Sequence, residues 1–430
     1  MRLGTGIKLF AAGMAMAAGP VAARADLPGG AATVNAPWSI TMASEVRYYS
    51  WKGTRGSPAG VSSERGSGTQ IYVPYALQLV GMPHGLLKVE LLGRGGWVRA
   101  RQSTGGLSGD VSTATDTVVS GTATYLGVNG IQPFVSLSAN LPTGKSALMG
   151  SAANARMDPD LVEISTFGEG WNVGPTLGFN LPLTSSFIVT ASAGYTWRGA
   201  FNRENSLVAV PGTAQSLTSI DPGDVFTATL ALGYSAGPWS AKLTASVSEE
   251  TTTAESGVAL YKAGRRYLAH ASLSYSQPEF WGVTTLNASI AHSNRNQVRY
   301  AGAPDLLTET LNANANVYRL GLEHLVPVGA LWLGPTGSYL HRDNNSYNSM
   351  TLQNVPAKDR YSAGLVARYA ASDTVTFNLR AEHVWVRENE RLAINGQQFS
   401  VYADAFVLSP AVPVVSSTGW QIAGGFNIKF

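Results

Sequence analysis

Apolar residues alternate with polar or small ones along the last eleven positions of the chain, Trp420 to Phe430. One set of alternate positions carries Trp, Ile, Gly, Phe, Ile and Phe, and the intervening set carries Gln, Ala, Gly, Asn and Lys. A period of two indicates a β-strand whose two faces meet different surroundings. The length matches the roughly 9–11 residues that a tilted strand needs to cross a bilayer. A strand of a soluble β-sandwich would alternate in the same way, so this segment alone leaves both classes open.

The same alternation recurs along the rest of the chain, and its apolar set often begins or ends in Tyr or Trp, as in an aromatic girdle. It predicts about sixteen strands, within a range of about 14 to 18, because the segments 102–128 and 389–417 are ambiguous. The predicted strands lie near residues 39–51, 68–80, 86–101, 117–128, 131–141, 170–182, 186–200, 224–235, 239–250, 264–276, 280–293, 315–327, 331–343, 358–370, 374–388 and 418–430.

The connections between these strands alternate between short and long. Every second one is a tight turn rich in Gly, Pro, Asn or Asp, such as Asn129-Gly130. Short periplasmic turns and longer external loops are typical of a transmembrane barrel, whereas a soluble sandwich has no reason to sort its loops. Lipid also tolerates no open sheet edge. The sequence therefore predicts an all-β, antiparallel, up-and-down transmembrane β-barrel. The long connections cover residues 52–67, 102–116, 142–169, 201–223, 251–263, 294–314, 344–357 and 389–417.

The N-terminal region reads as a secretory signal at 1–25, with basic Arg2 and Lys8, a short apolar run and the cleavage pattern Ala23-Arg24-Ala25. Residues 26–38 form a small lead-in, periplasmic or lumenal, and the barrel is expected to occupy 39–430. Export together with membrane-spanning strands predicts the outer membrane of a Gram-negative bacterium.

Composition agrees with a barrel and narrows the chemistry. Charged residues make up only 13% of the chain, against roughly a quarter in a typical soluble protein. There is no cysteine, and the net charge of +3 comes without a Lys/Arg run. Thiolate metal sites are thus excluded, and nucleic acid is not expected as a partner.

If the apolar positions face lipid, the opposite set faces the lumen. Its basic members outnumber its acidic members, and a basic wall would attract anions. Alternatively, these charges pair with one another, Glu323 with Arg319 and Glu382 with Arg380 being candidates, or with loop carboxylates. The basic set is Arg47, Lys88, Arg94, Arg198, Lys242, Arg266, Arg319, Arg360, Arg368, Arg380 and Lys429, and the acidic set is Glu45, Glu90, Glu323 and Glu382.

Barrels of about sixteen strands enclose an aqueous channel unless something fills it. The candidate fillers are the lead-in and two long loops. Loop 142–169 carries charges of both signs and would set a transverse field if it folded inward, but it would equally suit a solvated external loop. Loop 389–417 is unusually apolar from Phe399 to Val415. It could constrict the lumen, pair as an extra hairpin or cap the rim.

No pattern for covalent chemistry emerges. Gly233 to Gly237 matches G-x-S-x-G, but a nucleophile elbow needs a helix after its turn, and here another strand follows. The six histidines lack metal-ligand spacing. No catalytic residue, metal site or cofactor is therefore predicted.

Two segments carry a family resemblance. Phe134 to Lys145 reads FVSLSANLPTGK, and after a polar loop Gly170 to Leu183 reads GWNVGPTLGFNLPL, before the strand that runs to Trp197. This succession resembles the outer-membrane family named for the phenol-degradation meta-pathway. The resemblance implies a barrel that takes up small organic or aromatic compounds, although the charged inward set departs from what purely apolar cargo would require.

The sequence thus predicts a non-enzymatic outer-membrane channel for passive diffusion of small solutes, with small organic or aromatic anions as candidate cargo. The alternatives are a non-transporting barrel that binds through its surface loops and, third, an outer-membrane hydrolase. The closing strand resembles the C-terminal signal of outer-membrane proteins, so Trp420, Phe426 and Phe430 are expected to engage the barrel-assembly machinery. Outer-membrane lipid is the other expected partner. Monomer and trimer both remain open.

Overall fold

The structure is a computed structural model that describes residues 38–54, 65–128, 130–204, 215–277, 279, 281–300, 303–348, 351, 353–390, 394–399, 404–409 and 414–430. The signal sequence predicted at 1–25 and all of the lead-in except Trp38 lie outside the described residues. Within those described ranges, no helix is long and apolar enough to cross a membrane.

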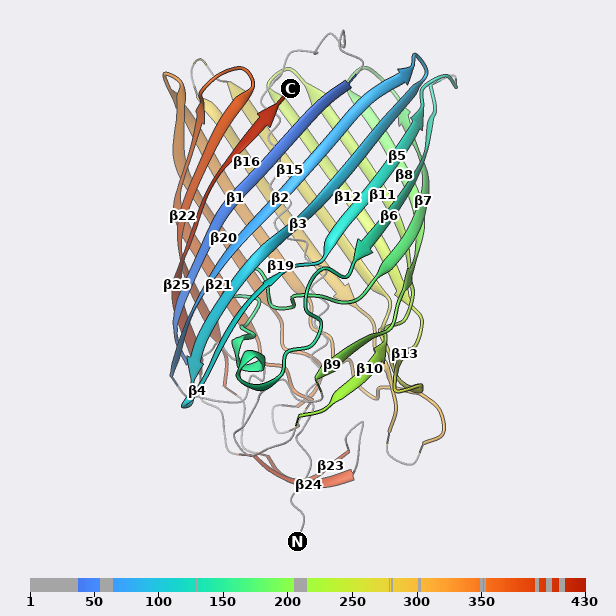
Figure 1. Ribbon diagram of the computed structural model, residues 1–430, viewed down its shortest axis with the longest axis vertical. Coiled ribbons are helices and arrows are strands. Elements are labelled where there is room, and N and C mark those ends of the chain that lie inside the picture. Colours follow the sequence, from blue (N-terminus) through green and yellow to red (C-terminus); the bar gives the residue numbers. More distant parts are fainter. Residues whose placement is uncertain are drawn as a thin grey trace.

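Seventeen strand segments join edge to edge in one sheet that closes on itself (Figure 1). Two of them, β4 (Leu107–Ala114) and β5 (Thr117–Tyr125), lie one after the other along β3 (Leu87–Thr104) and act as a single strand of the wall. The wall therefore has sixteen strands, which confirms the predicted fold. The others are β1 (Trp38–Gly53), β2 (Gly66–His84), β6 (Gln132–Leu141), β7 (Asn172–Pro182), β8 (Phe187–Arg198), β11 (Val225–Ala236), β12 (Trp239–Glu250), β15 (Arg266–Gln277), β16 (Gly282–Ser293), β19 (Val317–Val328), β20 (Leu331–Arg342), β21 (Lys358–Ala370), β22 (Val375–Glu388) and β25 (Val415–Lys429).

The barrel closes where its last strand meets its first. β25 pairs antiparallel with β1 from Thr41 opposite Lys429 to Gly53 opposite Ser417. Ile40 and Phe430 extend this ladder, because the N–H of Phe430 donates to the carbonyl of Ile40 at 2.8 Å. The alternating segment at the C-terminus is thus a wall strand, and it closes the barrel against the first strand.

The segment 102–116 was expected to be a long loop, and that expectation is wrong. β3 continues to Thr104, turns at Gly105-Gly106 and returns as β4. Both glycines have positive φ, 58° and 76°, which residues with a side chain rarely adopt. Gly and Asp interrupt the apolar alternation along β4, so its sequence resembles a loop although its backbone pairs as a strand.

Other long loops carry short strands. A second sheet joins β9 (Phe201–Glu204), β10 (Leu217–Asp221), β13 (Thr253–Glu255), β14 (Val258–Lys262), β17 (Gln297–Val298) and β18 (Leu307–Thr308). In 389–417, β23 (Ile394–Phe399) pairs with β24 (Asp404–Ser409), which confirms the hairpin among the three alternatives. This hairpin and the second sheet lie at the long-loop end, opposite the C-terminus (Figure 1).

The two faces of the wall differ as the alternation predicts. Large apolar side chains such as Leu177 (64% exposed) and Leu365 (59%) point outward. The buried apolar cluster lies on the other side, where Tyr49 and Trp51 of β1 pack with Phe167 from the loop between β6 and β7. The core of this molecule is therefore formed between the wall and a loop inside it.

Candidate functional site: the lumen and its inward loop

The loop between β6 and β7 folds into the lumen. The second half of its 3-10 helix η1 (Gly150–Ala155) is buried, and so are several of its apolar side chains, among them Leu148, Met157 and Phe167 at 2% exposure or less. They pack against residues on the lumenal face of β1, β3 and β22. Of the two readings of 142–169, the inward one is confirmed, and the solvated external loop is wrong.

Side-chain amides of the wall hold the backbone of this loop. Gln70, which is fully buried, both donates to the carbonyl of Ile164 at 2.7 Å and accepts from its N–H at 3.0 Å. Gln102 donates to the carbonyls of Asn154 and Arg156 at 2.5 and 2.6 Å. These pairings substitute for a neighbouring strand, and buried backbone groups need such partners. The loop is therefore held in one position along the wall.

A single carboxylate holds the two ends of the loop together. Asp116, between β4 and β5, accepts hydrogen bonds from the N–H of Gly144 at 2.9 Å and the N–H of Glu169 at 2.8 Å. Gly144 belongs to the Leu-Pro-Thr-Gly run that carried the family resemblance, and a Cβ there would lie 1.9 Å from the carbonyl oxygen of Phe167. Burial raises the pKa of the Glu169 carboxyl, an effect that nearby Arg198 opposes.

A buried ion pair fixes the first half of the loop. Arg156 donates to Glu204 of β9 at 2.8 Å, and the two side chains are 7% and 0% exposed. The second oxygen of Glu204 accepts from the N–H of Leu148 at 2.9 Å. Because β9 belongs to the second sheet at the long-loop end, this pair ties the loop to that sheet.

The carboxylates of the loop neutralise part of the basic wall. Glu163 forms an ion pair with Arg47 and accepts from the hydroxyl of Tyr49. Asp160 forms an ion pair with Lys358, and its carbonyl accepts from Arg360 at 2.9 Å. Glu45 also contacts Arg47, at 2.5 Å. The alternative in which loop carboxylates pair with wall charges is thus correct for these residues.

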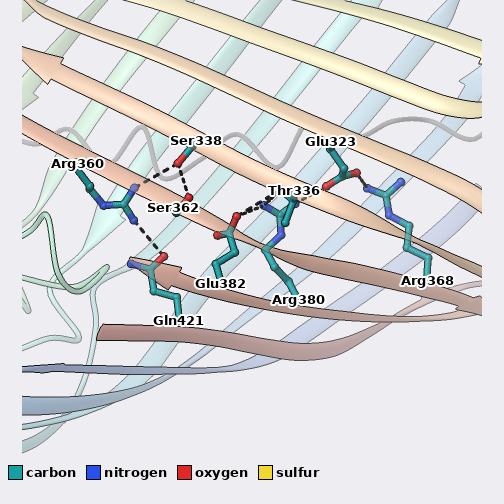
Figure 2. A network of polar contacts seen from close by, with 9 residues as sticks. All are labelled: Glu323, Thr336, Ser338, Arg360, Ser362, Arg368, Arg380, Glu382 and Gln421. Atoms are coloured by element: carbon teal, nitrogen blue, oxygen red, sulfur yellow. Dashed lines mark hydrogen bonds and ion pairs between the residues drawn. The ribbon is translucent and has the colours of Figure 1, made fainter. Parts of the chain in front are cut away.

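Figure 2 shows a second group of charges along β19 to β22. Glu323 receives Arg368 on one oxygen, at 2.6 Å, and Arg380 on the other, at 2.5 Å. Arg380 also lies 3.7 Å from Glu382, as predicted. The expected pairing of Glu323 with Arg319 is wrong, because Arg368 of β21 and Arg380 of β22, two and three strands away along the wall, occupy both carboxylate oxygens of Glu323.

Arg360 differs from the other arginines of this wall. Its guanidinium donates to Ser338 at 3.4 Å and Gln421 at 3.2 Å, as well as to the carbonyl of Asp160 (Figure 2). These acceptors are neutral, so they hold the side chain without cancelling its charge. Arg319 of β19 and Arg360 of β21 both lie opposite Leu340 of β20. Two arginines of the lumenal wall are therefore at the same height beside the loop.

The remaining predicted lumenal residues divide into paired and unpaired groups. Lys88 lies 3.2 Å from Glu90, and Arg198 lies 3.6 Å from Glu250. Within the part of the chain that the structure describes, some predicted cations take part in no ion pair; these are Arg94, Lys242, Arg319 and Lys429.

Four lumenal charges of the wall were missed from the sequence. Arg342 pairs with Glu388 at 3.1 Å, Lys358 pairs with Asp160 of the loop, and Glu250 lies beside Arg198. All four occupy the alternate positions of predicted strands that face the lumen. Extending the alternation to the last residue of each strand would have found them. The partners contributed by loop 142–169 had no such signal.

Neither a protein-family model nor a curated protein matches the chain. Solved structures that resemble it include the COG4313 outer membrane channel from Pseudomonas putida F1, with 10% identity, a TM-score of 0.38, and coverage of 92% of this chain and 96% of that one. Acinetobacter baumannii OccAB2 has 11% identity and a TM-score of 0.43, with coverage of 91% and 98%. A deletion mutant of the monoaromatic hydrocarbon channel TodX has 12% identity and a TM-score of 0.38, with coverage of 92% of this chain and 91% of that one.

The location follows from the wall itself. A closed antiparallel barrel with an apolar outer face and aromatic residues at both ends is the architecture of bacterial outer-membrane proteins. This chain is an outer-membrane barrel. Its short turns then face the periplasm, and its inward loop narrows the lumen from the long-loop side.

Proposed function

We propose that the barrel is a passive channel for small solutes and that it favours anions. The support comes from Arg319 and Arg360, which lie opposite the same residue of β20 on the lumenal wall, and from the contact of Arg360 with the carbonyl of Asp160 in the inward loop. Charges in a narrow, low-dielectric passage act more strongly than charges in bulk water. A negatively charged solute would be concentrated there, and no residue needs to react with it.

Small organic and aromatic acids are the proposed cargo. Their carboxylates would exchange between guanidinium groups, first beside the loop and then at Arg380 and Arg368 deeper in the lumen. Trp332 lies opposite Arg368 on the adjacent strand β20, and both side chains are on the lumenal face of the sheet. An aromatic ring could lie against this indole while its carboxylate meets the arginine. The resemblance to the phenol-degradation meta-pathway family agrees with such cargo.

The reversal potential of the refolded protein in a salt gradient tests the anion preference. The wild-type barrel is expected to favour chloride, and R319Q is expected to move the reversal potential toward zero. R387Q is the matched control, because Arg387 is exposed on the outward face of β22, away from the lumen. Cation preference in the wild-type protein would refute the proposal.

A binding barrel that does not transport is the second candidate. The sheet formed by β9, β10, β13, β14, β17 and β18 gives the long loops an ordered surface that a simple pore does not need. Single-channel recording separates the two functions. Discrete ohmic steps support the channel, and a closed barrel that binds ligands only through this sheet supports the alternative.

A further inference from the structure

A group of cations lies on the outside of the barrel, at the long-loop end of β1 to β4. We define it as the outer basic patch, composed of Lys52, Arg65, Arg99 and Arg101. All four are exposed, the side chains of Arg99 and Arg101 to 43% and 54%. Since these residues point away from the lumen, no solute passing through the barrel meets them.

The patch begins directly beyond the aromatic girdle. Arg99 follows Trp97 on the same outward face of β3, about 7 Å further along the strand, and Trp97 is 41% exposed. On β1, Tyr48 likewise precedes Lys52 on the same outward face, and it is 38% exposed. Aromatic girdles mark the membrane–water interface. The cations therefore stand at the level where lipid headgroups carry their charges.

The patch has an excess of positive charge. Asp110 of β4 is the one carboxylate paired with it in the described residues, and it bridges Arg101 at 2.7 Å and Arg99 at 3.5 Å. Among the described residues, these four cations and one carboxylate have a net charge of +3. A comparable group elsewhere on the rim, Lys262 and Arg265 with Glu249, has a charge of only +1.

Other parts of the rim have the opposite character. Outside β20 and β21, His341 lies between the carboxylates of Asp343 and Asp359, at 3.2 and 2.8 Å. Of these three groups of described residues on the rim, the outer basic patch has the greatest excess of positive charge.

We propose that the outer basic patch binds the phosphate groups of an outer-leaflet lipid. Guanidinium groups bind phosphate through two parallel N–H···O bonds. Arg99 and Arg101 present two such groups on one face of one strand, about 7 Å apart at their Cα atoms. Asp110 now occupies a position between them, and a phosphate with its greater charge would compete with it. The outward position beyond the girdle selects a lipid headgroup over phosphate in solution.

Binding of a bis-phosphorylated glycolipid to the full-length protein in nanodiscs tests this proposal, with phosphatidylethanolamine and inorganic phosphate as reference probes. R99Q/R101Q is expected to lower the glycolipid affinity roughly tenfold to a hundredfold. D110N is expected to raise it, since the competing carboxylate is removed. The matched control K242Q removes one lumenal cation and is expected to leave the affinity unchanged.

Each result bears on the patch independently of transport, because binding is measured without flux. Equal affinity of the wild-type protein and R99Q/R101Q would overturn the proposal, and so would a weaker D110N complex. If inorganic phosphate binds as tightly as the glycolipid, the patch does not select the phosphate group of a lipid, and the proposal is overturned. Unchanged single-channel conductance of R99Q/R101Q and D110N shows that these barrels have folded.

Discussion

The ion pair between Arg156 and Glu204 makes a quantitative prediction about the inward loop. In E204Q, the buried guanidinium keeps its charge and loses its counter-charge, while the side chain keeps its size. Breaking a buried ion pair from one side costs about 3–5 kcal/mol. The pair is 7% and 0% exposed, so solvent screening reduces this cost little. The free energy of opening the loop should fall by that amount.

Hydrogen exchange of the loop amides measures this change. The N–H of Ile164 is the best reporter, because it donates to Gln70 at 3.0 Å and touches neither member of the pair. If the loop opens as one unit, its exchange rate should rise roughly a hundredfold to several thousandfold. The same opening should increase current noise in single-channel recordings of E204Q.

The matched control is E249Q. Glu249 also pairs with an arginine, Arg265, but it is 40% exposed and lies on the outer rim. Exposed pairs contribute about 0–1 kcal/mol, so the exchange of Ile164 should not change. If E204Q leaves Ile164 as protected as in the wild-type protein, the ion pair does not hold the loop as a unit and the reasoning fails.

Three further predictions concern the loop and the outer rim. D116A removes the carboxylate that joins both ends of the loop, so faster exchange at residues 143–145 is expected by mass spectrometry, and unchanged exchange would contradict it. G109V should shift η1 and change the conductance, because a Cβ at residue 109 would lie 2.2 Å from the backbone nitrogen of Ala155; identical conductance would show that η1 does not border the pore. Burial raises the pKa of Glu309, so its contribution to stability is full below the unfolded pKa of about 4.3 and is lost as the pH rises through the folded pKa. E309Q should therefore protect the amide of Asn296, which contacts Glu309 at 3.4 Å, more than the wild-type protein at pH 7, with no difference near pH 4; equal protection at pH 7 would count against this.

The wall of the barrel could be derived from the order of residues along the chain. Side chains of a strand alternate between two faces, so apolar residues at every second position, as in Trp420 to Phe430, specify both a strand and its orientation toward lipid. The tight turns and long loops then fix the order of the strands and the end that faces the periplasm. β4 escaped this derivation because Gly109 and Asp110 break the alternation, and only pairing with β3 makes it a strand.

The contents of the lumen depended on tertiary structure. Alternation placed Arg47, Arg360 and their neighbours on the inner face, but it carries no information about partners far along the chain. Glu163 meets Arg47 across 116 residues and Asp160 meets Lys358 across 198. Such contacts arise only after the wall has closed and the loop has folded against it. Local periodicity therefore determined the barrel, whereas long-range packing and charge pairing decided which arginines remain available to a solute.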